Sequence, residues 1–228
     1  MIGVVVNTVL VIIGSLVGLF LRKGIPENIK NIIMIGLGLF TCMLGIKLGL
    51  EMKNALVVVL SIVTGGALGQ FIGLEQAIEQ LGSKLKNLVG STDQGLFAQG
   101  FVFASLLFCI GPMTVLGCVQ AGLENNPELL LIKGLMDGVS AIILASTFGL
   151  GVIFAALTVL FFQGGLVLLA GQMDFLTTPQ YLNDFTSVGG IIIFGIGIKL
   201  LGLKPIKNGN FLPALILVLF FNFIIKII

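Results

Sequence analysis

The 228-residue sequence contains no histidine, and only 10% of its residues are charged. Histidine is the commonest metal ligand and the usual proton carrier near neutral pH, so its absence excludes His-based zinc chemistry and Ser-His or Cys-His catalysis. The sequence also lacks a GxxxxGK[ST] phosphate-binding loop for ATP. We therefore expect a protein that is not an enzyme and has no cofactor, and the sequence identifies no metal.

Cysteine and net charge are also low. Cys42, Cys109 and Cys118 lie in apolar runs without a CxxC pair, which is typical of small hydrophobic residues and not of a disulfide or metal framework. A net charge of +2, without clusters of Lys and Arg, excludes a nucleic-acid partner. What is abundant is apolar sequence: 57% of the residues are hydrophobic and the mean hydropathy is +1.18. We expect the lipid bilayer to be the main partner of this chain.

Apolar runs divide the sequence into eight expected spans, since about 20 helical residues cross a hydrocarbon core of about 30 Å. The first run has no basic region before it and no cleavage site, so we expect a span and not a signal peptide. The sequence thus predicts an all-α polytopic transmembrane helix bundle that forms a single transmembrane domain over residues 1–228. The expected spans are residues 1–21, 32–50, 55–73, 95–122, 128–147, 150–171, 188–203 and 211–227.

The charges between these spans suggest an orientation, because cytoplasmic loops are enriched in Lys and Arg. We expect both termini outside. On the cytoplasmic side we place Arg22, Lys23, Lys30, Lys84, Lys86, Lys199, Lys204 and Lys207, and in the opposite loops Lys53, Glu124, Glu128, Asp174 and Asp184.

Residues 74–94, between the third and fourth spans, have an amphipathic pattern. Leu74, Ile78, Leu81 and Leu85 recur at helical spacing among charged residues. We expect a linker helix that lies on the cytoplasmic interface and covers the bundle.

The motif Gly-Ile-Lys-Leu ends the second span at residues 45–48 and the seventh at residues 197–200. An odd number of crossings separates the two motifs, so the repeated units would run in opposite directions, as in inverted-repeat transporters. The repeat halves would be residues 1–73 and 150–228, with residues 95–147 between them. Alternatively, the two lysines merely end helices at an interface, and the sequence leaves both readings open.

The run of residues 95–122 would be about 42 Å long as one helix, which is longer than the hydrocarbon core is thick. Near its middle, Pro112 has no N–H for the Phe108 carbonyl and Gly111 permits unusual backbone angles. We expect the helix to kink or unwind there, beside the Thr114 hydroxyl. Freed carbonyls at such breaks coordinate ions and substrates in transporters, although a plain proline kink is the alternative.

Asp137 is the acid predicted to lie deepest, about 13 Å into the span that begins near Glu128. A carboxylate near the midplane costs at least about 2.5 kcal/mol, so it should face the bundle interior and mark a functional site. Lys133, one turn earlier, can form a structural pair with it. However, Lys133 lies near the outer end of the span and can extend to the headgroups, leaving Asp137 free as the ion or proton carrier.

The spans contain other polar residues. Each of them alone is typical of a group that hydrogen-bonds to a neighbouring helix, whereas together they could line a polar path. Ser140 and Thr147 can share the helix face of Asp137. The predicted substrate or ion site consists of Asn7, Gly111, Pro112, Thr114, Gln120, Asp137, Ser140, Thr147 and Gln163.

The segments LLFCIGPMTVLGCVQAGL (residues 106–123), KGLMDG (133–138) and ASTFGLGV (145–152) resemble the YqgA/YdfK-like bacterial integral membrane proteins, a domain of unknown function. The likeness extends to Gln163-Gly164, Gly189-Gly190 and residues 210–214. It implies a multi-pass protein of the bacterial inner (plasma) membrane, in a family loosely described as transporters without a known substrate. Its recurring residues correspond to Gly111, Pro112, Gln120, Asp137, Thr147 and Gln163.

These observations predict a secondary transporter for an ion or small polar solute, with its site at Asp137 and the Gly111-Pro112 break. A passive ion channel with the same lining and a non-transporting membrane scaffold are the alternatives. Glycines four residues apart, such as Gly14 and Gly18, let helices approach closely and would suit a homo-oligomer.

Overall fold

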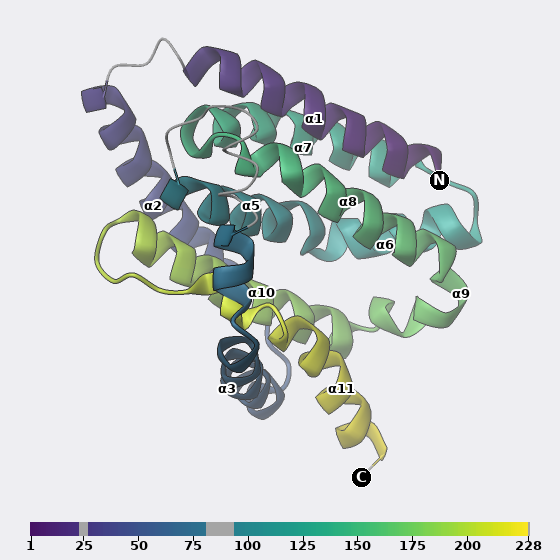
Figure 1. Ribbon diagram of the computed structural model, residues 1–228. Coiled ribbons are helices and arrows are strands. Elements are labelled where there is room, and N and C mark those ends of the chain that lie inside the picture. The colour runs from purple at the N-terminus through teal and green to yellow at the C-terminus, as the bar shows by residue number, and fades with distance from the viewer. Residues whose placement is uncertain (23–26, 81–93, 228) are drawn as a thin grey trace. The chain divides into compact units, whose positions relative to one another are not determined.

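The computed structural model describes residues 1–22, 27–80 and 94–227 (Figure 1). Within these residues the regular structure is helical throughout, which confirms the predicted all-α class; residues 74–80 form a further helical segment after α3. The elements are α1 (Ile2–Arg22), α2 (Glu27–Gly49), α3 (Ala55–Ile72), α5 (Gln94–Cys109), α6 (Pro112–Leu123), α7 (Glu128–Phe148), α8 (Gly151–Leu168), α9 (Ala170–Met173), η1 (Asp174–Thr177), α10 (Pro179–Leu200), η2 (Asn208–Phe211) and α11 (Ala214–Ile227).

The helices belong to two compact units, each built from two separate stretches of chain. Unit 1 comprises Met1–Lys30 and Gly95–Thr178, and therefore contains α1 and α5 to α9. Unit 2 comprises Asn31–Gln94 and Pro179–Ile228, and contains most of α2 together with α3, α10 and α11.

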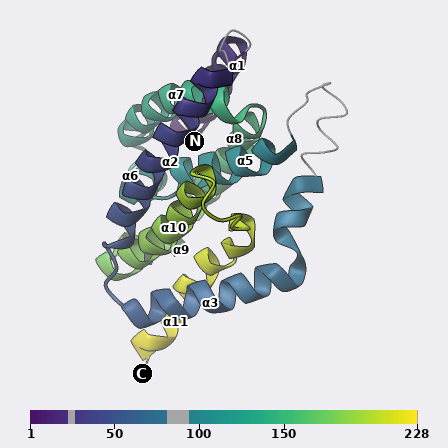
Figure 2. The same cartoon turned by 90° about the vertical axis from the view of Figure 1, so that its left-hand side faces the viewer.

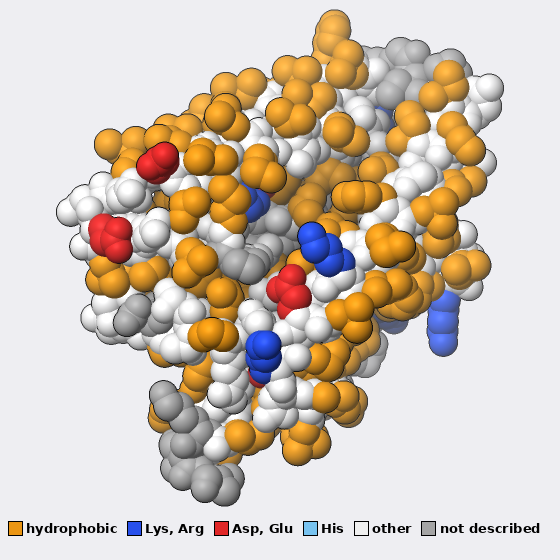
Figure 3. Space-filling model, turned by 180° about the vertical axis from the view of Figure 1, so that it is seen from behind, with side chains coloured by type: hydrophobic (Ala, Val, Ile, Leu, Met, Phe, Trp, Pro, Cys, Tyr) orange, Lys and Arg blue, Asp and Glu red, His pale blue; other side chains and the backbone are white. Residues whose placement is uncertain are grey.

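The helices present large apolar side chains outward and small or polar residues inward, as membrane helices do. In α1, Val5, Val9 and Ile13 are exposed, whereas Asn7 and Gly14 on the opposite face are buried. Figure 3 shows one face of the molecule, on which hydrophobic side chains predominate and charged ones are few. Seven of the described helices are long and apolar enough to span a membrane: α1, α2, α3, α7, α8, α10, and α11 taken together with η2.

Unit 1 is organised around the close contact of α1 with α7, which lie side by side (Figure 1). A Cβ atom added at Gly14 would clash with the carbonyl oxygen of Gly138, and one at Gly18 would clash with that of Ile142. Residue numbers increase in the same direction along this contact, so α1 and α7 are parallel. Glycine is required at these positions because the two backbones touch.

Unit 2 contains two contacts of the same kind between antiparallel helices. Gly45 of α2 meets Gly190 of α10, and Gly38 meets Gly197, so residue numbers increase along one helix as they decrease along the other. Gly65 of α3 meets Ala214 at the start of α11, and Gly69 meets Asn210 just before it, so residue numbers again run in opposite directions. Figure 2 shows α3 beside α11.

The parallel direction of α1 and α7 bears on how α5 and α6 are placed in the membrane. These two helices are bent by 57° at their break and are apolar enough to form either one broken span or a re-entrant loop. Two parallel spans need an odd number of crossings between them, and α2 and α3 supply two. Among the described helices, the α5/α6 pair is the candidate for the third crossing, and counting it gives the eight crossings expected from the sequence. Antiparallel spans need an even number of crossings between them. Among the described helices, the α2/α10 and α3/α11 pairs meet this condition if α5/α6 counts as one crossing.

The structure corrects the start of the seventh span and the position of Asp184. The sequence placed the start of this span at Val188 and put Asp184 in an outer loop, but α10 begins at Pro179 and Asp184 is fully buried within it. The Asp184 carboxylate accepts hydrogen bonds from the backbone N–H groups of Lys53 and Asn54, at 2.7 and 3.0 Å. These two bonds replace the hydration of Oδ1, whereas Oδ2 is buried without a hydrogen-bond partner among the described residues.

The expected amphipathic linker over residues 74–94 is described only in part. Residues 74–80 are helical, and Glu75, expected on the polar face at the interface, is 4% exposed. The remainder of that helix, with Lys84 and Lys86, lies outside the described residues.

Gly14→Ala should lower the unfolding temperature by several degrees, because the new methyl group forces α1 away from α7. The buried cysteines Cys109 and Cys118 provide the measurement, through their reaction with a maleimide dye as the detergent-solubilised protein is heated. Gly165→Ala in α8 is the matched control, since no heavy atom lies within 4 Å of its added Cβ. Equal unfolding temperatures for the two variants would contradict the proposed packing.

Eight crossings predict that both chain ends lie on the same side of the membrane. Reporter domains fused separately to the N-terminus and the C-terminus in a bacterial host measure this directly. Reporters that respond on opposite sides would show that α5 and α6 form a re-entrant loop.

Candidate functional site

Three helices of unit 1 bring a carboxylate and two amides together inside the bundle. Asp137 lies in the middle of α7 and is 3% exposed, while Asn7 of α1 and Gln163 of α8 are fully buried. The Nδ2 group of Asn7 donates to Asp137 Oδ2 at 3.1 Å and to Gln163 Oε1 at 3.2 Å. Gly134 faces Asn7 across the α1–α7 contact, which lets Asn7 reach the carboxylate. The structure thus joins three residues that the sequence predicted for one site.

Lys133 completes this cluster, contrary to the expectation that its amine would extend to the headgroups. It is 8% exposed and donates to Asp137 Oδ1, forming an ion pair within one turn of α7. Its Nζ also lies 5.9 Å from the centre of the Phe108 ring, within the range of a cation–π interaction. The amine stays inside because a carboxylate and an aromatic face replace its hydration. The prediction that Asp137 is free of Lys133 is wrong.

The predicted helix break is confirmed. Helix α5 ends at Cys109 and α6 begins at Pro112, while Gly111 between them has φ 134° and ψ 154°, a conformation open to glycine. The Thr114 hydroxyl donates to the Phe108 carbonyl at 3.1 Å. Thr114 therefore gives the Phe108 carbonyl the hydrogen bond that Pro112, which has no N–H, cannot donate. Because the Phe108 ring faces Lys133, the break adjoins the polar cluster.

Three other residues predicted for the site are not joined to the cluster by hydrogen bonds within the described part of the chain. Ser140 and Thr147 donate to the carbonyls of Met136 and Ile143, within their own helix. Gln120 lies near the end of α6, where its backbone carbonyl accepts from Glu124. Among the described residues, none of the three hydrogen-bonds to Asp137.

Two atoms of the cluster have unused hydrogen-bonding capacity. Asn7 Oδ1, an acceptor, and Gln163 Nε2, a donor, are buried without a hydrogen-bond partner among the described residues. Most buried polar atoms in proteins have a partner, so an unpartnered acceptor and donor on two neighbouring amides indicate a place where a polar molecule can bind.

Unit 2 contains a second ion pair, between the buried Glu75 and the half-buried Lys199, that sequence reasoning missed. Glu75 accepts from Lys199 Nζ at 3.2 Å and from the backbone N–H of Gly209 at 2.6 Å. The Glu75 N–H in turn donates to Asn210 Oδ1 at 2.8 Å. Lys199 belongs to the repeated Gly-Ile-Lys-Leu motif and Glu75 to the amphipathic segment of residues 74–94, but neither pattern indicated that the two would pair.

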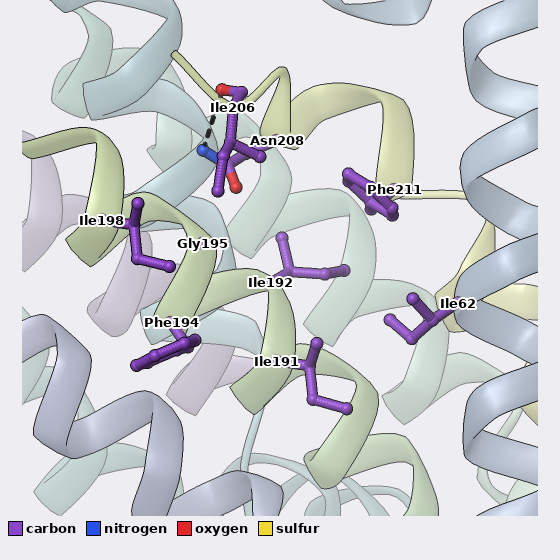
Figure 4. A pocket seen from close by; sticks show the side chains of 9 residues that line it. All are labelled: Ile62, Ile191, Ile192, Phe194, Gly195, Ile198, Ile206, Asn208 and Phe211. Atoms are coloured by element: carbon purple, nitrogen blue, oxygen red, sulfur yellow. Dashed lines mark hydrogen bonds between the residues drawn. The ribbon is translucent and has the colours of Figure 1, made fainter. Parts of the chain in front are cut away.

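A cavity of about 200 Å³ lies next to this pair, within unit 2. Figure 4 shows its almost wholly apolar lining, which includes Ile62, Ile192, Phe194 and Phe211. Asn208 is its polar residue: the Nδ2 group donates to the Ile206 carbonyl at 3.3 Å, and the buried Oδ1 has no partner among the described residues. One polar atom in an apolar cavity offers little specificity to a polar solute.

Comparison with known sequences agrees with the resemblance found in the motifs. A family model described as "Protein of unknown function (DUF554)" matches residues 2–223. The chain belongs to this family. It is similar to the "Uncharacterized membrane protein YdfK" of Bacillus subtilis (strain 168), with 37% identity over 221 residues that cover 95% of this chain and 93% of the relative.

A second relative of this DUF554 chain is the "Uncharacterized protein YqgA" of Escherichia coli (strain K12). The identity is 29% over 220 residues, covering 95% of this chain and 94% of the relative. No solved structure matches the chain. The apolar helices and the membrane protein among its relatives together identify this family member as a membrane protein.

The buried pair in unit 1 predicts a non-additive response to substitution. Lys133→Met or Asp137→Leu alone leaves one buried charge without its partner and should cost about 3–5 kcal/mol of unfolding free energy. The double variant removes both charges and should cost much less than the sum. Unfolding free energies measured in detergent complete this double-mutant cycle. A double variant whose loss equals the sum would show that Lys133 and Asp137 are not coupled.

Proposed function

We propose that this protein is a secondary transporter of an ion or small polar solute, with a site formed by Asp137, Asn7, Gln163 and the adjoining α5/α6 break. The observation that carries the proposal is a charged and amide-rich cluster buried among three membrane helices. The proposed location is the bacterial inner membrane, as the family resemblance implies.

The cost of such a cluster favours a functional role. Ionisable residues in membrane helices are expensive, and they commonly mark the pathways of ions and substrates. Apolar residues of similar volume often stabilise a protein as well as a buried ion pair does, so stability alone is a weak reason for Lys133 and Asp137. The break in α5/α6 is the second favourable feature, because interrupted helices form binding sites in transporters.

We also propose that residues 1–73 and 150–228 are inverted repeats. The two Gly-Ile-Lys-Leu motifs are 152 residues apart, as are Gly38 and Gly190. Gly45 contacts Gly190 while Gly38 contacts Gly197, so the corresponding glycines meet in the reciprocal arrangement of a local two-fold axis. This reciprocity supports a transporter built from two halves of opposite direction.

A membrane scaffold is the second candidate, and the closed Lys133–Asp137 pair favours it. In a scaffold this pair would serve only to join helices. The scaffold predicts that substitutions at either residue lower stability and change no flux.

Asp137→Asn should abolish saturable transport, because the uncharged amide no longer balances Lys133. The measurement uses proteoliposomes supplied with gradients of Na⁺, K⁺, H⁺, chloride, glycine and malonamide, and compares each rate with that of empty liposomes. We expect at least one solute to be carried by the parent and its rate to fall about tenfold or more, the effect of losing roughly 1.4 kcal/mol.

Thr8→Val is the matched control on α1, since the Thr8 hydroxyl donates to the Val4 carbonyl of its own helix. Asp137→Glu, which keeps the charge, separates loss of transport from loss of folding. Rates equal to those of empty liposomes for every solute, or full transport by Asp137→Asn, would refute the proposed function.

A further inference from the structure

The charges of the unit 1 cluster cancel one another. Lys133 and Asp137 form a closed pair, and Asn7 and Gln163 are neutral. A metal cation entering beside Asp137 would face the ammonium group of Lys133, and an anion entering beside Lys133 would face the carboxylate. Because Coulomb repulsion is strong where water is scarce, the closed pair disfavours a solute with a net charge.

Although its charges cancel, the cluster has unused hydrogen-bonding groups. Asn7 Oδ1 can accept one or two more hydrogen bonds and Gln163 Nε2 can donate two, and both atoms are buried without a partner among the described residues. The two side chains are adjacent, because the Asn7 Nδ2 and Gln163 Oε1 atoms are only 3.2 Å apart. An unpartnered acceptor and an unpartnered donor thus belong to two buried side chains, on α1 and α8, that are hydrogen-bonded to each other.

The residue after Gln163 lies where α8 faces α1 without a tight backbone contact. Gly164 is buried, and the nearest atoms to a Cβ added there would be 3.9 and 4.0 Å away, on Met1 and Val4 of α1. This separation contrasts with the tight glycine contacts of α1 with α7. The α1–α8 contact at Gly164 is therefore less tight than the α1–α7 contact at Gly14 and Gly18.

We propose that the solute is a small uncharged molecule of carboxamide type, with an N–H donor and a C=O acceptor on neighbouring atoms. Its N–H donates to Asn7 Oδ1 and its carbonyl accepts from Gln163 Nε2, so both unpartnered atoms gain a bond while the Lys133–Asp137 pair stays closed. This inference rests on the proposed transport function and names the solute class of the same site.

The test measures binding of acetamide and malonamide to the full chain in detergent, by the shift in unfolding temperature. A ligand that binds the folded state stabilises it by mass action, so we expect a saturable rise of roughly 2–4 °C once the amide exceeds its Kd several-fold. Acetone, which accepts hydrogen bonds but cannot donate, should give a smaller rise. Sodium and potassium should give none that depends on Asp137.

Gln163→Met removes the unpartnered donor at similar volume and should abolish the rise. Asn222→Leu is the matched control: Asn222 is a fully buried amide of α11 that bonds to Gln180 and to the Val218 carbonyl. This control should respond to acetamide as the parent does. If Gln163→Met does not fold, the comparison of acetamide with acetone in the parent decides the question.

The absence of any rise with either amide, or a rise with Na⁺ or K⁺ that Asp137→Asn removes, would overturn the inference. Such an ion result accompanied by ion flux would leave the transport function intact and refute only the uncharged solute. Conversely, amide binding without flux of any solute would refute transport and leave the binding site standing.

Discussion

The close approach of α1 to α7 is the constraint on which the polar cluster depends. Glycine at residues 14, 18, 134 and 138 removes side chains from the surface between the helices, and the two backbones come into contact. Asn7 is then near enough to Asp137 to share a hydrogen bond, and Gln163 is joined through Asn7. In hydrocarbon a charge needs such partners, so packing by glycine and burial of charge are two aspects of one arrangement.

Much of this arrangement could be predicted from sequence, because the bilayer imposes simple rules. Long apolar runs identified the spans, and Gly111-Pro112 identified the break, since the length of a span and the geometry of proline are local properties. The burial of Asp137 followed from its depth in an apolar run. Asn7 and Gln163 were recognised as polar residues inside spans, but nothing in their sequence neighbourhoods showed that they would meet.

The remaining features depend on partners that are distant in the sequence. Asp184 looked like a loop residue, yet the N–H groups that compensate its charge come from residues 53 and 54. Glu75 looked like a surface acid, yet Lys199 and the Gly209 N–H bind it. Lys133 was expected to reach the headgroups because it lies near the end of its helix. The Phe108 ring, which belongs to another helix, faces its amine inside the bundle instead. Hydropathy measures how costly it is to bury a polar group and contains no information on the groups that compensate it.

The interleaving of the two units along the chain has a consequence for synthesis. Unit 1 takes α1 from the first residues and α7 from far downstream, and 130 positions separate Asn7 from Asp137. At a ribosome speed of about 5–20 residues per second, α1 is complete roughly ten seconds before its neighbour is translated. During that interval its glycine face and the Asn7 amide have no native partner in the bilayer. The nascent chain must therefore shelter an unfinished helix until the matching one is inserted.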